Sequence, residues 1–354
     1  MTYEVLISDI QNLINHEDDP SDDIDEFFSA PLGVTPPKGR RRRSANWSRG
    51  SGGDYYIDDE LDFYWLSPMG RYATHDEINT WLRTIPNYQP DLARVIDIGY
   101  SFEGRNLKVI KIGSPGSNKP AIWIDGGFHA REWIAPATAL VALYGEDDVV
   151  TRLVNTYDWF ILPVANPDGY VYTHETIMFY RSTNHKTGHC ESNLFARCRS
   201  SRPCSSTYAG ERPFSEMETI SIANYILRRR TRFKMYISLH SYSQLWLTPW
   251  SYTRKEPNDN DRVLRVANIS VEALTSVYNT SYLTGSPAVI IYSAGGTSFD
   301  WAKGVAGIKY SYTLELRDRG HYGFLLPRRY IVPVCEETWQ GIKTAALQLI
   351  DELF

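Results

Sequence analysis

The hydrophobic pattern after residue 63 predicts strands that alternate with helices. Short apolar runs indicate strands at residues 95–98, 107–112, 121–125, 159–164 and 235–239, with another strand inside 307–316. Segments with helical periodicity indicate helices at 74–82, 136–144, 217–228, 263–278 and 336–354. Thr74 and Glu77 form a capping-box pattern that opens the first helix, and residues 86–90, with two prolines, end it. This order favours an α/β fold, a mixed, mostly parallel twisted sheet with helices on both faces.

The first 63 residues do not continue this pattern. Residues 1–15 carry apolar positions at helical spacing, but one short amphipathic segment cannot fold alone. A mostly acidic stretch at 17–26 leads through prolines to Arg40 to Arg43 and then to Gly and Ser up to residue 53. We therefore interpret residues 18–63 as a linker and residues 64–354 as the patterned domain.

Four consecutive arginines have three interpretations: a nucleic-acid or nuclear-targeting patch, a solvated charge run, or a processing site. We favour a site for a processing protease, because the run lies in a linker, where cleavage sites concentrate. Nine acidic and five basic residues precede residue 44, so the remaining chain is near neutral. A near-neutral domain without a basic face disfavours nucleic-acid binding.

Composition further limits the classes of protein to which this chain can belong. Hydrophobic residues make up 42% of the chain and charged residues 22%, which is ordinary for a globular protein. No window approaches about 20 uninterrupted apolar residues, so no membrane span is expected, and residues 1–4 lack the pattern of a secretory signal. The four cysteines are too few for a disulfide scaffold, although the three within residues 190–204 would allow one bridge. Three sequons, weak evidence for secretion by themselves, occur at Asn46, Asn268 and Asn279.

The strongest chemical signal lies in residues 123–139, WIDGGFHAREWIAPATA. A strand that ends in Asp125 runs into two glycines, which bring the backbone into the crevice where open α/β sheets bind ligands. His129 and Glu132, three residues apart, lie on one face of a turn and can reach one metal ion. A bare H-x-x-E is more often a surface pair, but the preceding strand and glycines favour a metal site, which needs a third protein ligand.

Two further candidates lie in predicted strands. His240 follows the strand at 235–239 and suits the third ligand, although a lone histidine there is more often a hydrogen-bonded core residue. Glu315 lies in an apolar strand pattern, where a carboxylate is costly unless it is paired or functional. Arg317, two residues on, is its candidate structural partner. The functional alternative makes Glu315 a general base that takes a proton from metal-activated water.

The motifs HAREW, NPDGY, SEMET, HSYSQ, GGTSFDW and ELRDRGHYGFLLP occur in an order that resembles the zinc metallocarboxypeptidases of the pancreatic A/B type. The likeness covers about residues 64–354, and residues 3–17 resemble the end of that family's propeptide. The resemblance implies the zinc carboxypeptidase fold and a secreted zymogen, with residues 1–17 as the remnant of a propeptide and cleavage at Arg40 to Arg43. It also implies peptide or protein C-termini as substrates, and we expect a monomer without nucleic-acid or membrane partners.

The resemblance also assigns the chemistry position by position. His129, Glu132 and His240 would bind one Zn²⁺ and leave a fourth position for water, as in catalytic zinc sites. Glu315 would act as general base and then as general acid. Arg181, in the sequence FYRS, matches the arginine that stabilises the developing oxyanion, a contribution of roughly 3 to 4 kcal/mol.

Four other positions match substrate-binding residues of the family. Tyr292 matches the mobile tyrosine that closes over the substrate, while Arg131 and Tyr242 match residues that line the cleft. Phe299 matches the base of the pocket for the substrate's last side chain, where basic-specific members carry an acid. Burying an unpaired Lys or Arg head against this ring costs several kcal/mol, so we expect A-like specificity for apolar C-terminal residues.

Two segments are shorter than the family pattern. The loop between Cys190 and Cys204, which match the family's disulfide pair, lacks the Asn-Arg-Asn core that holds the substrate's terminal carboxylate. Asn193 matches the first asparagine, whereas only Arg197 or Arg199 is available to replace the arginine. The helix at 136–144 is the second shortened segment. Two functions of different classes follow: an active exopeptidase, or a catalytically impaired zinc-containing protein that binds peptides or inhibitors.

Overall fold

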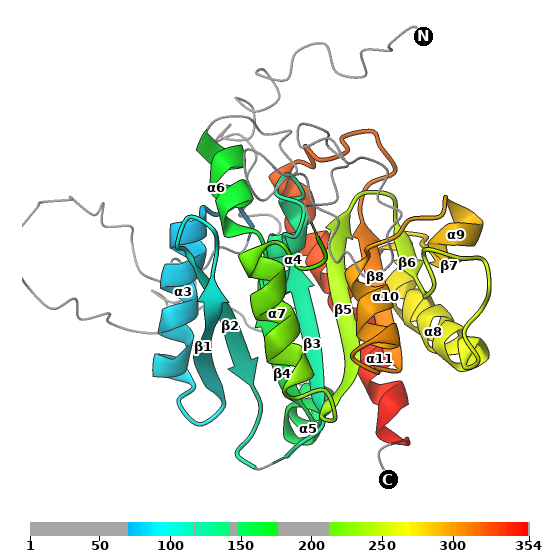
Figure 1. Ribbon diagram of the computed structural model, residues 1–354, viewed down its shortest axis with the longest axis horizontal. Helices are drawn as coiled ribbons and strands as arrows, with labels where there is room; N and C mark the ends of the chain where they lie inside the picture. The colour runs from blue at the N-terminus through cyan, green and yellow to red at the C-terminus, as the bar shows by residue number, and fades with distance from the viewer. Residues whose placement is uncertain (1–69, 117, 142–147, 176–211, 353–354) are drawn as a thin grey trace, which may run out of the picture. The chain divides into compact units, whose positions relative to one another are not determined.

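A computed structural model describes residues 70–116, 118–141, 148–175 and 212–352, and its framework is a sheet of eight strands (Figure 1). The strands follow the order β1-β2-β4-β3-β5-β8-β6-β7. Their bounds are β1 Ala93–Tyr100, β2 Asn106–Ile112, β3 Ala121–Gly126, β4 Asp158–Leu162, β5 Phe233–Ser241, β6 Leu245–Leu247, β7 Leu283–Gly285 and β8 Tyr310–Leu316.

The centre of the sheet is parallel and its edges are mixed. β4, β3, β5 and β8 pair in parallel, whereas β1 with β2, β2 with β4, and β6 with β8 are antiparallel. Every residue of β3 is buried, as expected for a central strand that is covered on both faces. The predicted mixed, mostly parallel sheet is therefore confirmed.

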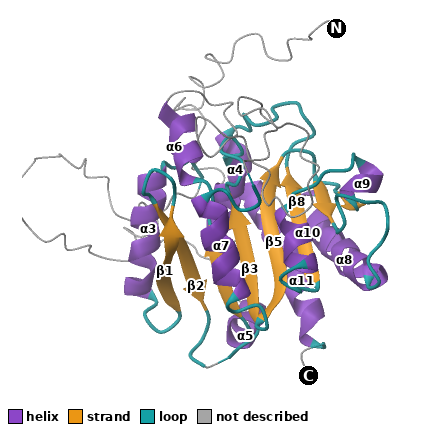
Figure 2. Ribbon diagram, in the orientation of Figure 1, coloured by secondary structure: helices purple, strands orange, loops and turns teal. Residues whose placement is uncertain are grey.

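Helices cover both faces of this sheet (Figure 2). In Figure 1, α7 and α10 lie in front of the strands, and α4, α5 and α11 lie behind them. The helices are α3 His75–Tyr88, α4 Ile134–Val141, α5 Asp148–Thr156, α6 Pro167–Glu175, α7 Met217–Leu227, α8 Asn260–Tyr278, α9 Pro287–Ile290, α10 Ser298–Gly304 and α11 Ile331–Ile350, with a 3-10 helix at Arg328–Tyr330. None of these helices is long and apolar enough to cross a membrane.

The capping box predicted for the first helix is confirmed. The Thr74 hydroxyl accepts from Glu77 N, and Thr74 N donates to Glu77 Oε2 at 2.8 Å. The predicted end is wrong, because α3 continues past residue 82 to Tyr88 with Pro86 inside it. Ile78, Trp81, Leu82 and Ile85 are buried, so packing holds the last turn although proline removes one backbone donor.

Several elements lie outside the sequence prediction. β6 and β7 have three residues each, too few to show a periodicity. α6 begins where a turn-like NPDG follows a strand, with the Asn166 side chain accepting from Gly169 N at 2.9 Å. Asparagine before a proline is a helix-start signal, so this helix was accessible from the sequence. The predicted boundaries at residues 17 and 63 lie outside the described residues.

Arg317 has a different partner from the one considered above. Its Nε donates to Glu337 Oε1 at 2.8 Å, and its Nη2 contacts Glu337 Oε2. β8 ends at Leu316, so Arg317 leaves the strand and meets α11. These two contacts form a bidentate ion pair between the end of β8 and the last helix. The Glu337 side of this pair is fully buried.

Glu337→Ala should lower the free energy of unfolding by about 3 to 5 kcal/mol, because it leaves the Arg317 cation largely buried without its partner. Urea denaturation measures this loss. As the control, Glu336→Ala removes a more exposed carboxylate that accepts from Tyr278, and should cost about 1 kcal/mol. A loss from Glu337→Ala no larger than that of the control would contradict the assigned role of the pair.

Candidate functional site

A sharp turn after β3 places the first two predicted ligands. A Cβ at Gly126 would lie 2.9 Å from the Ala135 carbonyl oxygen, so only glycine lets the two segments approach this closely. Gly127 has a φ of 67° and would also place a Cβ against Pro136. The chain therefore folds back at once, and Glu132 N donates to His129 O at 3.1 Å within the turn.

The three predicted metal ligands converge above the ends of β3 and β5. Glu132 Oε1 lies 2.8 Å from His129 Nδ1, and Glu132 Oε2 lies 2.9 Å from His240 Nδ1. One ligand atom from each residue lies within 4.8 Å of the others. Two imidazole nitrogens and one carboxylate form the donor set of catalytic zinc sites, so these residues fit a zinc ion.

The cluster is largely shielded from solvent. The side chains of His129, Glu132 and His240 are 12%, 6% and 1% exposed. Burial opposes ionisation of Glu132, but the two neighbouring histidines prevail and lower its pKa to about 2. Ser241 N also donates to Glu132 Oε2 at 3.2 Å. Glu132 is therefore held as a carboxylate, the form that binds a metal.

Glu315 lies directly beside this cluster in the sheet. In the parallel pairing of β5 with β8 it is the partner of His240, so the two side chains share one face. Leu245 of β6 pairs with Glu315 from the other side. The predicted base is thus positioned by a rigid central strand rather than by a loop.

A buried polar layer that the sequence analysis missed supports His240. Ser238 Oγ lies 3.0 Å from His240 Nε2, and Asp125 is the partner of Ser238 across β3 and β5. Trp123 Nε1 donates to Asp125 Oδ2 at 2.7 Å. Burial raises the pKa of Asp125 to about 6, although the neighbouring polar groups of Ser238, Tyr236 and Trp123 oppose the rise. The sequence signal that could have indicated this layer was Asp125 at the end of an apolar strand, because a buried carboxylate needs polar partners.

Arg131 and Tyr242 meet on a common aromatic residue. The Arg131 guanidinium carbon lies 4.0 Å from the centroid of the Phe324 ring, and the Tyr242 ring lies edge-on to Phe324 with centroids 4.9 Å apart. A Cβ at Gly323 would lie 3.0 Å from the Tyr242 ring. The structure therefore joins two predicted cleft residues through Phe324, a residue within a quoted motif that was given no role.

Phe299 lies at the second position of α10 and is 2% exposed, within the hydrophobic cluster that also holds Leu247. The neighbouring acid, Asp300, accepts from Ser251 N at 2.9 Å and from Ser251 Oγ at 2.5 Å. Burial raises the pKa of Asp300 to about 6. The Asp300 carboxylate is thus hydrogen-bonded to Ser251 inside the protein.

Tyr292 is more exposed than the other site residues that the structure describes. Tyr292 follows α9 and is 67% exposed, which gives its ring room to move. Arg181, Asn193, Arg197, Arg199 and the cysteines up to Cys204 lie outside the described residues. Cys335 is a buried free cysteine.

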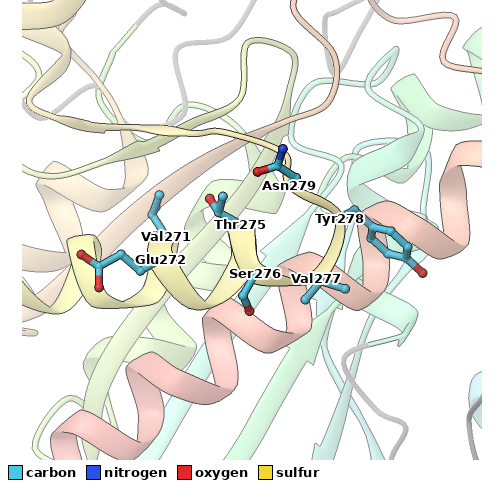
Figure 3. A pocket seen from close by; sticks show the side chains of 7 residues that line it. All are labelled: Val271, Glu272, Thr275, Ser276, Val277, Tyr278 and Asn279. Carbon is cyan, nitrogen blue, oxygen red and sulfur yellow. The ribbon is translucent and has the colours of Figure 1, made fainter.

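A pocket lies at the end of α8 (Figure 3). Its lining runs from Val271 to Asn279 along the last turns of the helix and includes none of the predicted site residues that the structure describes. Asn279, an exposed sequon asparagine, ends the helix with a φ of 57°.

The chain is similar to known zinc carboxypeptidases. A family model described as zinc carboxypeptidase matches residues 78–341. Carboxypeptidase B of Astacus astacus is 42% identical over 290 residues, which cover 78% of this chain and 96% of that protein. Bovine carboxypeptidase A1 is 40% identical over 369 residues, which cover 99% of this chain and 80% of that protein.

Solved structures agree with the fold. The crystal structure of thrombin activatable fibrinolysis inhibitor matches with a TM-score of 0.75 and 37% identity, covering 80% of this chain and 75% of that one. The crystal structure of carboxypeptidase A from Helicoverpa armigera matches with a TM-score of 0.73 and 28% identity, and the match covers 80% of this chain and 75% of that one.

Proposed function

Because the chain belongs to the zinc carboxypeptidase family, whose members are peptide hydrolases, we propose that it releases single apolar residues from free peptide C-termini. The observation that carries this proposal is the placement of Glu315 beside a converged His129, Glu132 and His240. The arrangement combines a three-ligand metal site with a carboxylate in position to exchange protons.

The proposed chemistry uses one Zn²⁺, held by the three converged side chains. The bound ion would supply Lewis-acid activation of the scissile carbonyl and of the attacking water. Glu315 takes the proton of that water and delivers it to the leaving amine, acting first as base and then as acid. Arg181 stabilises the oxyanion from a segment outside the described residues.

The apolar preference is supported by the charges around Phe299. A substrate lysine or arginine needs a free carboxylate in the pocket, because an unpaired buried cation is costly. The adjacent acid, Asp300, is occupied by the backbone and hydroxyl of Ser251. We therefore propose A-like specificity, although the crayfish relative is a carboxypeptidase B.

Mass spectrometry of a defined peptide mixture tests this function. Zinc-loaded protein cleaved after Arg43 should shorten peptides that end in Leu or Phe by one residue, and should leave peptides that end in Lys or Arg intact. The same peptides with amidated C-termini serve as matched controls and should not be trimmed. Trimming of basic ends at an equal rate would refute the specificity.

The second candidate is a zinc-containing protein that binds peptides or inhibitors with impaired turnover. The short loop between Cys190 and Cys204 favours it, because a lost bidentate arginine weakens recognition of the terminal carboxylate. Zinc binding with no trimming of any peptide would support this candidate over the exopeptidase.

We also propose a secreted, monomeric zymogen that is processed at Arg40 to Arg43. The linker composition around these arginines and the likeness of residues 3–17 to a propeptide end support this proposal. Asn279 is an exposed sequon at the end of α8, accessible to glycosylation in a secretory pathway.

A further inference from the structure

The two ring nitrogens of His240 face different partners. Nδ1 lies in the ligand cluster, 2.9 Å from Glu132 Oε2 and 3.1 Å from His129 Nδ1. Nε2 points the other way, 3.0 Å from Ser238 Oγ. His240 is 1% exposed, so bulk solvent does not reach the ring.

Zinc binding at Nδ1 dictates where the protons lie. The Nδ1 lone pair is then used, so Nε2 carries the hydrogen of the neutral ring and donates it to Ser238 Oγ. A hydroxyl that accepts this hydrogen bond still has its own hydrogen to donate. Ser238 is fully buried, and this hydrogen therefore requires an acceptor within the protein.

Asp125 is the suitable acceptor. It is the partner of Ser238 in the parallel pairing of β3 with β5, so both side chains lie on the face that carries His240. Trp123 occupies Asp125 Oδ2, whereas the buried Oδ1 has no hydrogen-bond partner among the described residues. A carboxylate is an acceptor only, which fixes the direction of the hydrogen bonds.

We propose that Asp125 and Ser238 are positioning residues that hold His240 through a chain of hydrogen bonds, from His240 Nε2 to Ser238 Oγ and on to Asp125 Oδ1. This inference rests on the proposed zinc site. The chain of hydrogen bonds selects the tautomer with Nδ1 free for the metal, keeps the ring from rotating, and makes the ligand more basic. It spans two central strands, so the sheet register itself sets the ligand geometry.

Zinc affinity tests the proposal without relying on catalysis. The dissociation constant is measured by competition with a chromophoric chelator for the full chain and its variants, and circular dichroism of the zinc-free proteins checks the fold. Ser238→Ala and Asp125→Asn should each weaken zinc binding by roughly 10 to 100-fold, the usual cost of losing such a partner. Ser238→Thr keeps the hydroxyl and should retain affinity.

Thr313→Val is the matched control. Thr313 is the partner of Ser238 on the opposite side, in β8, and its buried hydroxyl also has no hydrogen-bond partner among the described residues. It should leave the zinc dissociation constant unchanged. Equal affinities for the wild type, Ser238→Ala and Asp125→Asn would overturn the positioning role, as would an equal loss from Thr313→Val. If the wild type itself bound no zinc, the proposed function would fail as well.

Discussion

Removal of zinc should abolish peptide hydrolysis completely, and added Zn²⁺ should restore it. The physical reason is that His129, Glu132 and His240 provide nitrogen and oxygen donors for the metal but no nucleophile of their own. The protein is dialysed against a chelator, and the release of a C-terminal Leu or Phe from a model peptide is followed as Zn²⁺ is titrated back.

Mg²⁺ provides the control for this experiment. It demands octahedral oxygen ligands, so a site with two imidazoles should not be reactivated by it. His240→Ala should be inactive even in excess Zn²⁺, since one of only three protein ligands is gone. Full activity after verified metal removal would contradict a metal-dependent mechanism.

Glu315→Gln should lower kcat by roughly 10²- to 10⁴-fold, the usual contribution of a general acid–base residue. Glutamine keeps the shape of the side chain and its place beside His240 in β8, but it cannot accept and return a proton. Because Glu315 is not among the three ligands, zinc content measured by atomic absorption should remain that of the wild type.

Glu272→Gln makes the same chemical change at a distant position and should leave kcat unaltered. Glu272 is exposed and lines the pocket at the end of α8 in Figure 3. If Glu315→Gln lost zinc together with activity, the residue would be part of the metal site rather than the base. Unchanged kcat would exclude the base assignment.

Local residue patterns predicted the contacts that lie within a single turn of the chain. The three-residue spacing of His129 and Glu132 after a strand and two glycines indicated a shared metal ion, and the structure brings both side chains together. Thr74 and Glu77 correctly located the start of α3. In each case the interacting residues lie within one turn of the chain, so a short separation in the sequence also gives a short distance in space.

Contacts between distant segments were not accessible in this way. His240 is 111 residues from His129, and its place after a predicted strand made it only a candidate third ligand until the structure brought the two rings together. Arg317 lies two residues from Glu315 yet pairs with Glu337, because β8 ends between the two. Phe324 gained a role only when it was seen between Arg131 and Tyr242.

The sequence by itself determined many of the helices and strands of this protein, its family and the types of residue that can bind zinc, because these follow from local periodicity and from motifs along the chain. The tertiary structure decided which side chains share a face and how they are supported. The register of β3, β5 and β8 aligns Asp125 with Ser238 and His240 with Glu315. That alignment depends on how separate strands pair and pack, which no single segment encodes.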